Sequence, residues 1–201
     1  DSSHYEALWK LARAYIDVGL GSPKAQQMQY YFTGEKIARR CASLYPDSAE
    51  GHFFLAVALG RVALDVGGKH KIQLAKEIKT EAEAALQINP AHDGAMHLIG
   101  RWHYELSNLN FVERTVAKIV FGGLPPGASY EQAASFFEQA IAHNPQAPVH
   151  RLEYGRALLK LERVAAARAQ LEKCLGLPDL FWDDPQHKQT ARQLLDKIGK
   201  P

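Results

Sequence analysis

Residues 130–145 read YEQAASFFEQAIAHNP, and a small residue, Ala140, lies five positions before Pro145. The same kind of ending recurs three more times along the chain, as CASLYP at 41–46, ALQINP at 85–90 and CLGLP at 174–178. A proline ends a helix, and a small residue lets that helix lie close against a neighbouring one. The recurrence therefore predicts an internal repeat whose units each end in a closely packed helix.

A second recurrence lies upstream of each proline, where four residues follow the 1-4-5-8 spacing of one helix face. The four sets are Leu8, Leu11, Ala12 and Tyr15; His52, Leu55, Ala56 and Leu59; Met96, Ile99, Gly100 and His103; and Arg151, Tyr154, Gly155 and Leu158. The third member is always Gly or Ala, as expected where the two helices of a pair cross. Together with the A-x₃-F spacing of Ala133 and Phe137, this is the tetratricopeptide pattern, which spans about 34 residues per unit.

We therefore expect an all-α fold, a tetratricopeptide-like α-solenoid of about four helix pairs, because one pair alone cannot bury its apolar face. The expected single domain covers residues 1–201, with units at 4–46, 48–90, 92–145 and 147–178. A capping helix is expected at 184–199, with Asp184 as its N-cap and a polar outer face.

The repeats are unequal in length, since Pro46, Pro90, Pro145 and Pro178 are 44, 55 and 33 residues apart. The extra residues fall between the first and second helices of the first three units. The longest insertion is 108–130. Its apolar residues recur at helical spacing, namely Phe111, Val112, Val116, Ile119, Val120 and Phe121. This stripe either covers a groove or packs on the outer helices, and the sequence does not distinguish the two.

Composition excludes several classes of protein. The chain has 201 residues, 46% of them apolar, and 24 Lys and Arg against 22 Asp and Glu. This balance argues against a disordered chain and against a general nucleic-acid binder. The longest apolar run, residues 53–59, is too short to span a bilayer. Two cysteines do not make a disulfide framework.

The first residue is Asp1, and one interpretation is that a signal or anchor has been removed before it. Such a segment would make the domain periplasmic in a bacterium and associated with an organelle membrane in a eukaryote, and the compartment stays open. We expect a monomer.

The stretch His97 to Leu109, HLIGRWHYELSNL, resembles the regulator of microtubule dynamics family. Glu113-Arg114, Phe121-Gly122 and the helix from Tyr130 through Pro145 extend the similarity, which covers roughly residues 5–198. The resemblance implies a helical, non-enzymatic domain. Eukaryotic members are associated with microtubules, with contacts between the endoplasmic reticulum and mitochondria, and with lipid binding. A net charge near zero does not favour binding of this chain to the acidic surface of tubulin.

In tetratricopeptide proteins the first helix of each pair lines a concave groove. Transferring the family's groove positions to this chain gives aromatic and aliphatic residues and three arginines at one register. The predicted groove residues are Trp9, Arg13, Phe53, Val57, His97, Arg101, Tyr104, Leu152 and Arg156.

Two interpretations of the arginines remain open. Their planar guanidinium groups would bind a carboxylate or phosphate, which suits an acidic peptide of a protein partner or an anionic amphiphile such as a phospholipid or fatty acid. Replacing Arg101 and Arg156 by Ala should then abolish binding and leave the fold intact. Alternatively, the arginines pair with Glu6, Glu50, Glu105 or Glu153 on neighbouring helices. The function is thus a scaffold that binds a partner, or a module that binds or transfers lipid.

We expect no catalytic residues, no metal site and no cofactor. No H-E-x-x-H, G-x-S-x-G or dinucleotide fingerprint occurs in the sequence. Cys41 and Cys174 fall at the small-residue position of a second helix, which predicts a packing role for both.

Overall fold

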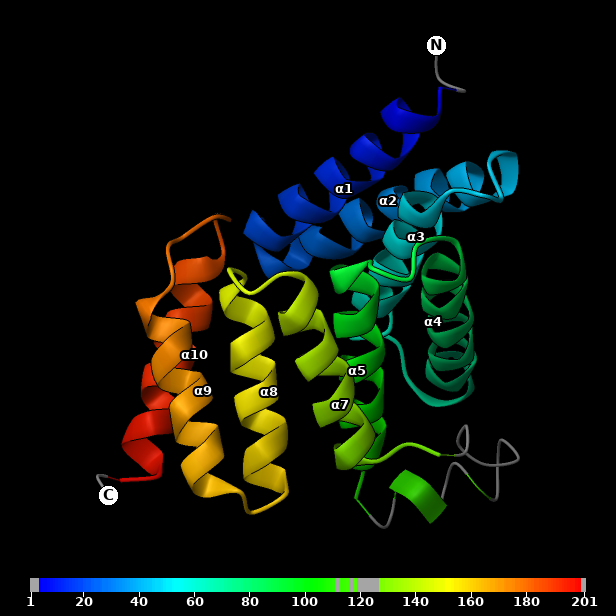
Figure 1. Ribbon diagram of the computed structural model, residues 1–201. Coiled ribbons are helices and arrows are strands. Elements are labelled where there is room, and N and C mark those ends of the chain that lie inside the picture. Colours follow the sequence, from blue (N-terminus) through cyan, green and yellow to red (C-terminus); the bar gives the residue numbers. More distant parts are fainter. Residues whose placement is uncertain (1–3, 111–112, 116–117, 119–126, 200–201) are drawn as a thin grey trace. The chain divides into compact units, whose positions relative to one another are not determined.

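The computed structural model describes residues 4–110, 113–115, 118 and 127–199, and all regular structure within them is helical (Figure 1). The predicted all-α class is confirmed. The apolar stripe of the long insertion lies outside the described residues, as does most of the insertion itself, so the two interpretations of that segment stay predictions.

The chain divides into two compact units. The first runs to Leu98 and also includes residues 109–126, and the second comprises residues 99–108 and 127–201. The first unit contains α1 (Tyr5–Gly21), α2 (Lys24–Leu44), α3 (Ala49–Val62) and α4 (Gly68–Ile88). The second contains α7 (Tyr130–His143), α8 (Pro148–Lys160), α9 (Val164–Gly176) and α10 (Asp184–Lys197). Helix α5 (Asp93–Ser107) contributes its first part to one unit and the remainder to the other.

Within each unit, packing joins helices that are close in sequence. In the first unit α1 packs on α2, α2 on α3 and α3 on α4, with a smaller contact between α1 and α3. In the second, α7 packs on α8, α8 on α9, and α10 on both α8 and α9. These are the contacts of stacked helical repeats.

The recurring prolines mark helix ends as predicted. Helices α2, α4, α7 and α9 each end two residues before one of them, namely Pro46, Pro90, Pro145 and Pro178. The small residues before them are fully buried: Cys41, Ala85, Ala140 and Cys174 are all 0% exposed.

The crossing positions also carry the predicted small residues. A methyl group on Gly100 would lie 2.7 Å from Cε1 of Phe137, and one on Gly155 would lie 2.8 Å from Cδ2 of Leu171. Phe137 and Leu171 are themselves fully buried, so the helices touch here without room for a side chain. Ala12 and Ala56 occupy the equivalent positions in the first unit and are also fully buried.

The capping helix is present, but its predicted N-cap is wrong by one residue. Asp183 is the N-cap residue and Asp184 is the first residue of α10. The Asp184 carboxylate holds the preceding loop. Its Oδ2 accepts hydrogen bonds from the backbone N–H groups of Leu180 and Phe181, both at 2.8 Å.

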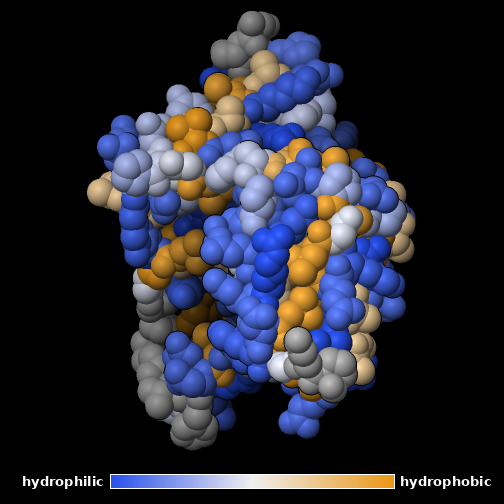
Figure 2. All heavy atoms as spheres, turned by 90° about the vertical axis from the view of Figure 1, so that its left-hand side faces the viewer, coloured by the Kyte–Doolittle hydropathy of each residue, from blue (hydrophilic) through white to orange (hydrophobic). Residues whose placement is uncertain are grey.

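Helix α10 closes the core of the second unit. Ala191 is fully buried against Leu152, Leu171 and Cys174, while the side chains of Arg192, Gln193 and Asp196 are exposed. Figure 2 shows the side that carries α9 and α10, where a narrow hydrophobic band runs between hydrophilic side chains. A polar outer face on the last helix keeps the end of a repeat array soluble.

Candidate functional site

Four aromatic rings form a continuous row in the first unit. Trp9 of α1 stacks on Phe54 of α3, with ring centroids 5.5 Å apart and planes 2° from parallel. Phe54 meets Phe53 edge-on at 4.9 Å, and Phe53 lies 4.5 Å from the ring of His92. We call Trp9, Phe54, Phe53 and His92 the aromatic row. Stacked and edge-on pairs of this kind are worth about 0.5–1.5 kcal/mol beyond the area that they bury.

The aromatic row is built by the helix register. Trp9 and Phe53 hold the same position in the first helices of consecutive repeats, so stacking of the repeats brings α1 and α3 together at this point. The sequence predicts both residues but misses Phe54 and His92. The adjacent Phe53-Phe54 pair was a usable signal for Phe54, whereas His92 precedes α5 and joins the row through tertiary structure alone.

The row combines partly exposed rings with a polar end. Trp9, Phe53 and Phe54 are each partly exposed, whereas His92 is only 8% exposed. The Nε2 atom of His92 lies 3.6 Å from a carboxylate oxygen of Glu50. The buried indole Nε1 of Trp9 has no hydrogen-bond partner. Partly exposed rings of this kind offer apolar area against which a partner's apolar side chain can pack.

The other predicted residues of the first unit lie near this row in sequence but differ in environment. Arg13 is exposed on α1, where its Nε is 3.4 Å from Oδ2 of Asp17. Val57 on α3 and His97 on α5 are partly buried. Arg13 therefore pairs with a carboxylate of its own helix.

In the second unit, two predicted arginines converge on one buried carboxylate. Glu153 of α8 is 3% exposed. Its Oε1 accepts from Nη1 of Arg101 at 3.1 Å and from Nη1 of Arg156 at 3.0 Å. Arg101 also donates through Nη2 to the exposed Glu105 at 2.8 Å. We call Arg101, Glu105, Glu153 and Arg156 the arginine cluster.

The cluster adjoins the predicted Tyr104. The guanidinium carbon of Arg156 lies 5.1 Å from the centroid of the Tyr104 ring, a cation–π distance. Tyr104 is only 5% exposed, and burial raises the pKa of its phenol. For Arg156, burial lowers the pKa, but the Glu153 carboxylate and its other neighbours raise it by more, so the net pKa is above its usual value. Arg156 thus stays charged at physiological pH.

Pairing of an arginine with a glutamate on a neighbouring helix, one of the two interpretations of the sequence, is therefore present for Arg101 and Glu153. Arg156 pairs with Glu153 within α8. The side chains of Arg101 and Arg156 are still 36% and 32% exposed, so each guanidinium reaches solvent. With Glu105 paired, the cluster has no net charge. With Glu105 displaced by a ligand, two cations face a single buried carboxylate and an incoming anion is favoured.

Leu152, the remaining predicted groove residue, is 2% exposed and packs with Leu171, Cys174 and Ala191. It belongs to the core of the second unit. The two cysteines are buried as well. Burial raises the pKa of both thiols, that of Cys174 to about 11, so both are protonated at neutral pH.

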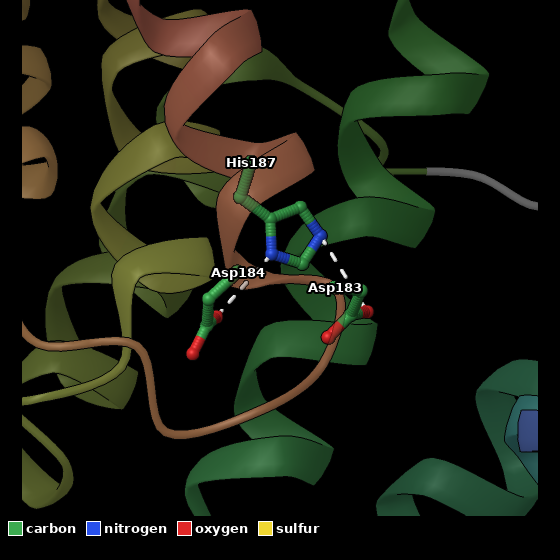
Figure 3. Close-up of side chains that lie close together, drawn as sticks. All are labelled: Asp183, Asp184 and His187. Atoms are coloured by element: carbon green, nitrogen blue, oxygen red, sulfur yellow. Dashed lines mark ion pairs between the residues drawn. The ribbon is translucent and has the colours of Figure 1, made fainter.

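One group in the described part of the chain has the spacing of metal ligands. Asp183, Asp184 and His187 lie at the start of α10, and their ligand atoms are within 4.8 Å of one another (Figure 3). The imidazole Nδ1 is 3.5 Å from Asp184 and Nε2 is 3.8 Å from Asp183. Because the Asp184 carboxylate already binds two backbone N–H groups, its position is explained by the loop that it holds.

Comparison with known protein families shows which family the chain belongs to. Residues 1–199 match the family described as regulator of microtubule dynamics protein 1-3. The chain belongs to the regulator of microtubule dynamics family. It is 32% identical over 198 residues to regulator of microtubule dynamics protein 1 of Bos taurus, covering 97% of this chain and 62% of that protein. It is 28% identical to protein 3 of Xenopus laevis, covering 96% of this chain and 42% of that protein.

Solved structures extend the relationship to the tetratricopeptide fold. A thermophilic tetratricopeptide-repeat protein of Thermus thermophilus matches with a TM-score of 0.60 at 16% identity, over 94% of this chain and 83% of that one. MamA matches with a TM-score of 0.56 at 15% identity, over 94% and 82%. The chain spans less than two thirds of the length of the family relatives named above. None of the described helices is long and apolar enough to cross a membrane.

Proposed function

We propose that this member of the regulator of microtubule dynamics family is a non-enzymatic recognition module that binds a protein partner through the first helices of its repeats. The observation that carries the proposal is the aromatic row. Three partly exposed rings from two consecutive repeats contact one another in sequence within the first unit. Aromatic side chains of this kind dominate the energetics of protein interfaces.

The arginine cluster supports the same function in the second unit. Arg101 and Arg156 present charged donors, and Glu105 is an exposed carboxylate that a partner's Asp or Glu can replace. We therefore propose that the partner carries apolar residues for the aromatic row and acidic residues for the arginine cluster.

The test compares affinity purifications from cells with three baits. The first bait is wild type, and the second carries Trp9→Leu and Phe53→Leu, which remove the flat rings but keep apolar side chains. The third carries Phe32→Leu and serves as the control, because Phe32 on α2 is 46% exposed and lies outside the row. We expect a partner that the second bait loses and the third retains. The proposal fails if all three baits capture the same proteins.

The same preparations distinguish the lipid alternative. Organic extraction of the purified wild-type protein, followed by mass spectrometry, detects bound phospholipid or fatty acid. A stoichiometric lipid in the absence of a row-dependent protein partner would assign the surface to lipid.

A further inference from the structure

The connection between α9 and α10 exposes three consecutive large apolar side chains. Leu180, Phe181 and Trp182 are 53%, 47% and 57% exposed. Single exposed apolar residues are common on proteins, but a contiguous set that includes Trp and Phe marks an interaction surface. We call residues 177–183 the LFW loop.

The loop is held in place by α10. The buried Asp184, 1% exposed, accepts hydrogen bonds from the N–H groups of Leu180 and Phe181. Lys188 donates to the carbonyl oxygen of Leu177 and forms an ion pair with Asp179. The backbone is thus held just before the apolar triplet and at its first two residues, while the side chains of the triplet stay exposed. A loop ordered before binding loses little conformational entropy when it docks.

The negative charges on either side of the triplet indicate which kind of partner the loop would bind. Residues 177–188 contain three aspartates and one lysine, a formal net charge of −2 with His187 neutral. Asp179 and Asp183 are 50% and 33% exposed and flank the triplet on either side. Anionic lipid headgroups would repel these carboxylates. Asp179 already pairs with Lys188, but half of its side chain still reaches solvent. Lysine or arginine side chains of a protein can pair with these carboxylates.

We propose that the LFW loop is a second docking surface, separate from the aromatic row. It inserts Phe181 and Trp182 into an apolar pocket of a protein partner whose rim carries Lys or Arg. The proposal concerns the second unit alone and does not depend on the function proposed above.

The test uses a display library of random 16-residue peptides, selected on the full wild-type chain. Counter-selection uses the variant Leu180→Ser, Phe181→Ser and Trp182→Ser, whose changed side chains are all exposed. Circular dichroism checks that this variant is folded. We expect enriched peptides that combine Lys or Arg with apolar residues and bind the variant at least about tenfold more weakly.

Matched variants separate the contributions of shape and charge. Val164→Ser is the control, because Val164 is 45% exposed on α9 and lies outside the loop. It should leave binding of the selected peptides unchanged. Asp183→Asn, which leaves the Asp179–Lys188 ion pair in place, should weaken that binding severalfold and reduce its dependence on salt.

Three results would overturn the proposal. The first is a selection that yields no peptides specific for the intact loop, or yields peptides without basic residues. The second is sedimentation of the wild type, but not the triple Ser variant, with phosphatidylcholine–phosphatidylserine vesicles, which would assign the loop to lipid. The third is a dimer in analytical ultracentrifugation that the triple Ser variant abolishes, which would assign it to a second copy of the chain.

Discussion

Glu153 connects the two arginines of the second unit, and its burial changes what their removal should do. The sequence suggests that Arg101→Ala with Arg156→Ala leaves the fold intact. In the structure both arginines pair with a carboxylate that is 3% exposed. Removing them strands a buried negative charge, which typically costs about 3–5 kcal/mol.

We therefore predict that the double Ala variant has a free energy of unfolding about 3–5 kcal/mol lower than that of the wild type, measured by urea denaturation. The triple variant Arg101→Gln, Glu153→Gln and Arg156→Gln should recover most of this loss, because it removes the charge together with its partners. Equal stability of the double variant and the wild type would show that Glu153 does not need these arginines. Binding experiments should use the triple variant.

The thiol of Cys174 predicts a pH dependence of stability. Its pKa is raised to about 11 by burial in the folded protein, compared with about 8.5 for an exposed thiol. Above pH 8.5 the unfolded chain loses this proton while the folded chain keeps it. The folded state therefore loses about 3 kcal/mol of relative stability as the pH rises from about 8.5 to 11.

The variant Cys174→Ala isolates this effect. The difference in free energy of unfolding between wild type and variant should be constant at pH values well below the pKa of the thiol in the unfolded chain. Above that pKa, the wild type should become less stable relative to the variant. A difference that stays constant throughout an alkaline titration would contradict the burial of the thiol. Urea titrations at each pH provide the measurement.

At the level of single side chains, the sequence predicts which residues share a helix register but not what each one contacts. Register alone identifies Trp9 and Phe53, and the structure joins their helices through Phe54. The two arginines also follow from register. Arg156 and Glu153 are three residues apart on α8, so their pairing is local. The pairing of Arg101 with Glu153 depends on how α8 lies against the second part of α5, which no local pattern specifies.

Among the helices, a glycine at a helix crossing and a glycine away from any crossing should respond to substitution in opposite ways. Gly100→Ala places a methyl group 2.7 Å from the buried Phe137 ring, so we predict a loss of about 1–2 kcal/mol even after the gain in helix propensity. Gly60→Ala in α3 has nothing within 4 Å of the new methyl group, and it should stabilise the protein by up to about 1 kcal/mol. Thermal denaturation of the two variants tests this, and a Gly100→Ala protein as stable as the wild type would contradict the close contact.

The helices follow from sequence more completely than the side-chain contacts do. The prolines and small residues act locally, since one ends a helix and the other permits a crossing within the same hairpin. The N-cap of α10 lies one residue before the predicted position, because the Asp184 side chain binds the backbone of the preceding loop. That contact depends on the path of residues 177–183. The long insertion carries no repeat signal of its own.

Over the whole molecule, packing between helices that are neighbours in sequence predicts that the loss of one helix destabilises only the unit to which it belongs. A chain that ends at Gly176 lacks α10 and exposes Leu152, Leu171 and Cys174. We predict that hydrogen exchange measured by mass spectrometry shows loss of protection in α8 and α9, while α1 to α4 keep theirs. Unchanged protection of α8 and α9 would show that the capping helix is dispensable. Loss of protection throughout would show that the two units unfold together.

Because helices α1 to α4 pack on helices close to them in sequence, they can assemble while the ribosome is still producing the remainder of the chain. Each helix of this group can pack on helices that were synthesised before it. The contacts among α1 to α4 do not involve residues that are synthesised after α4. For these four helices the order of synthesis is therefore compatible with the order of packing.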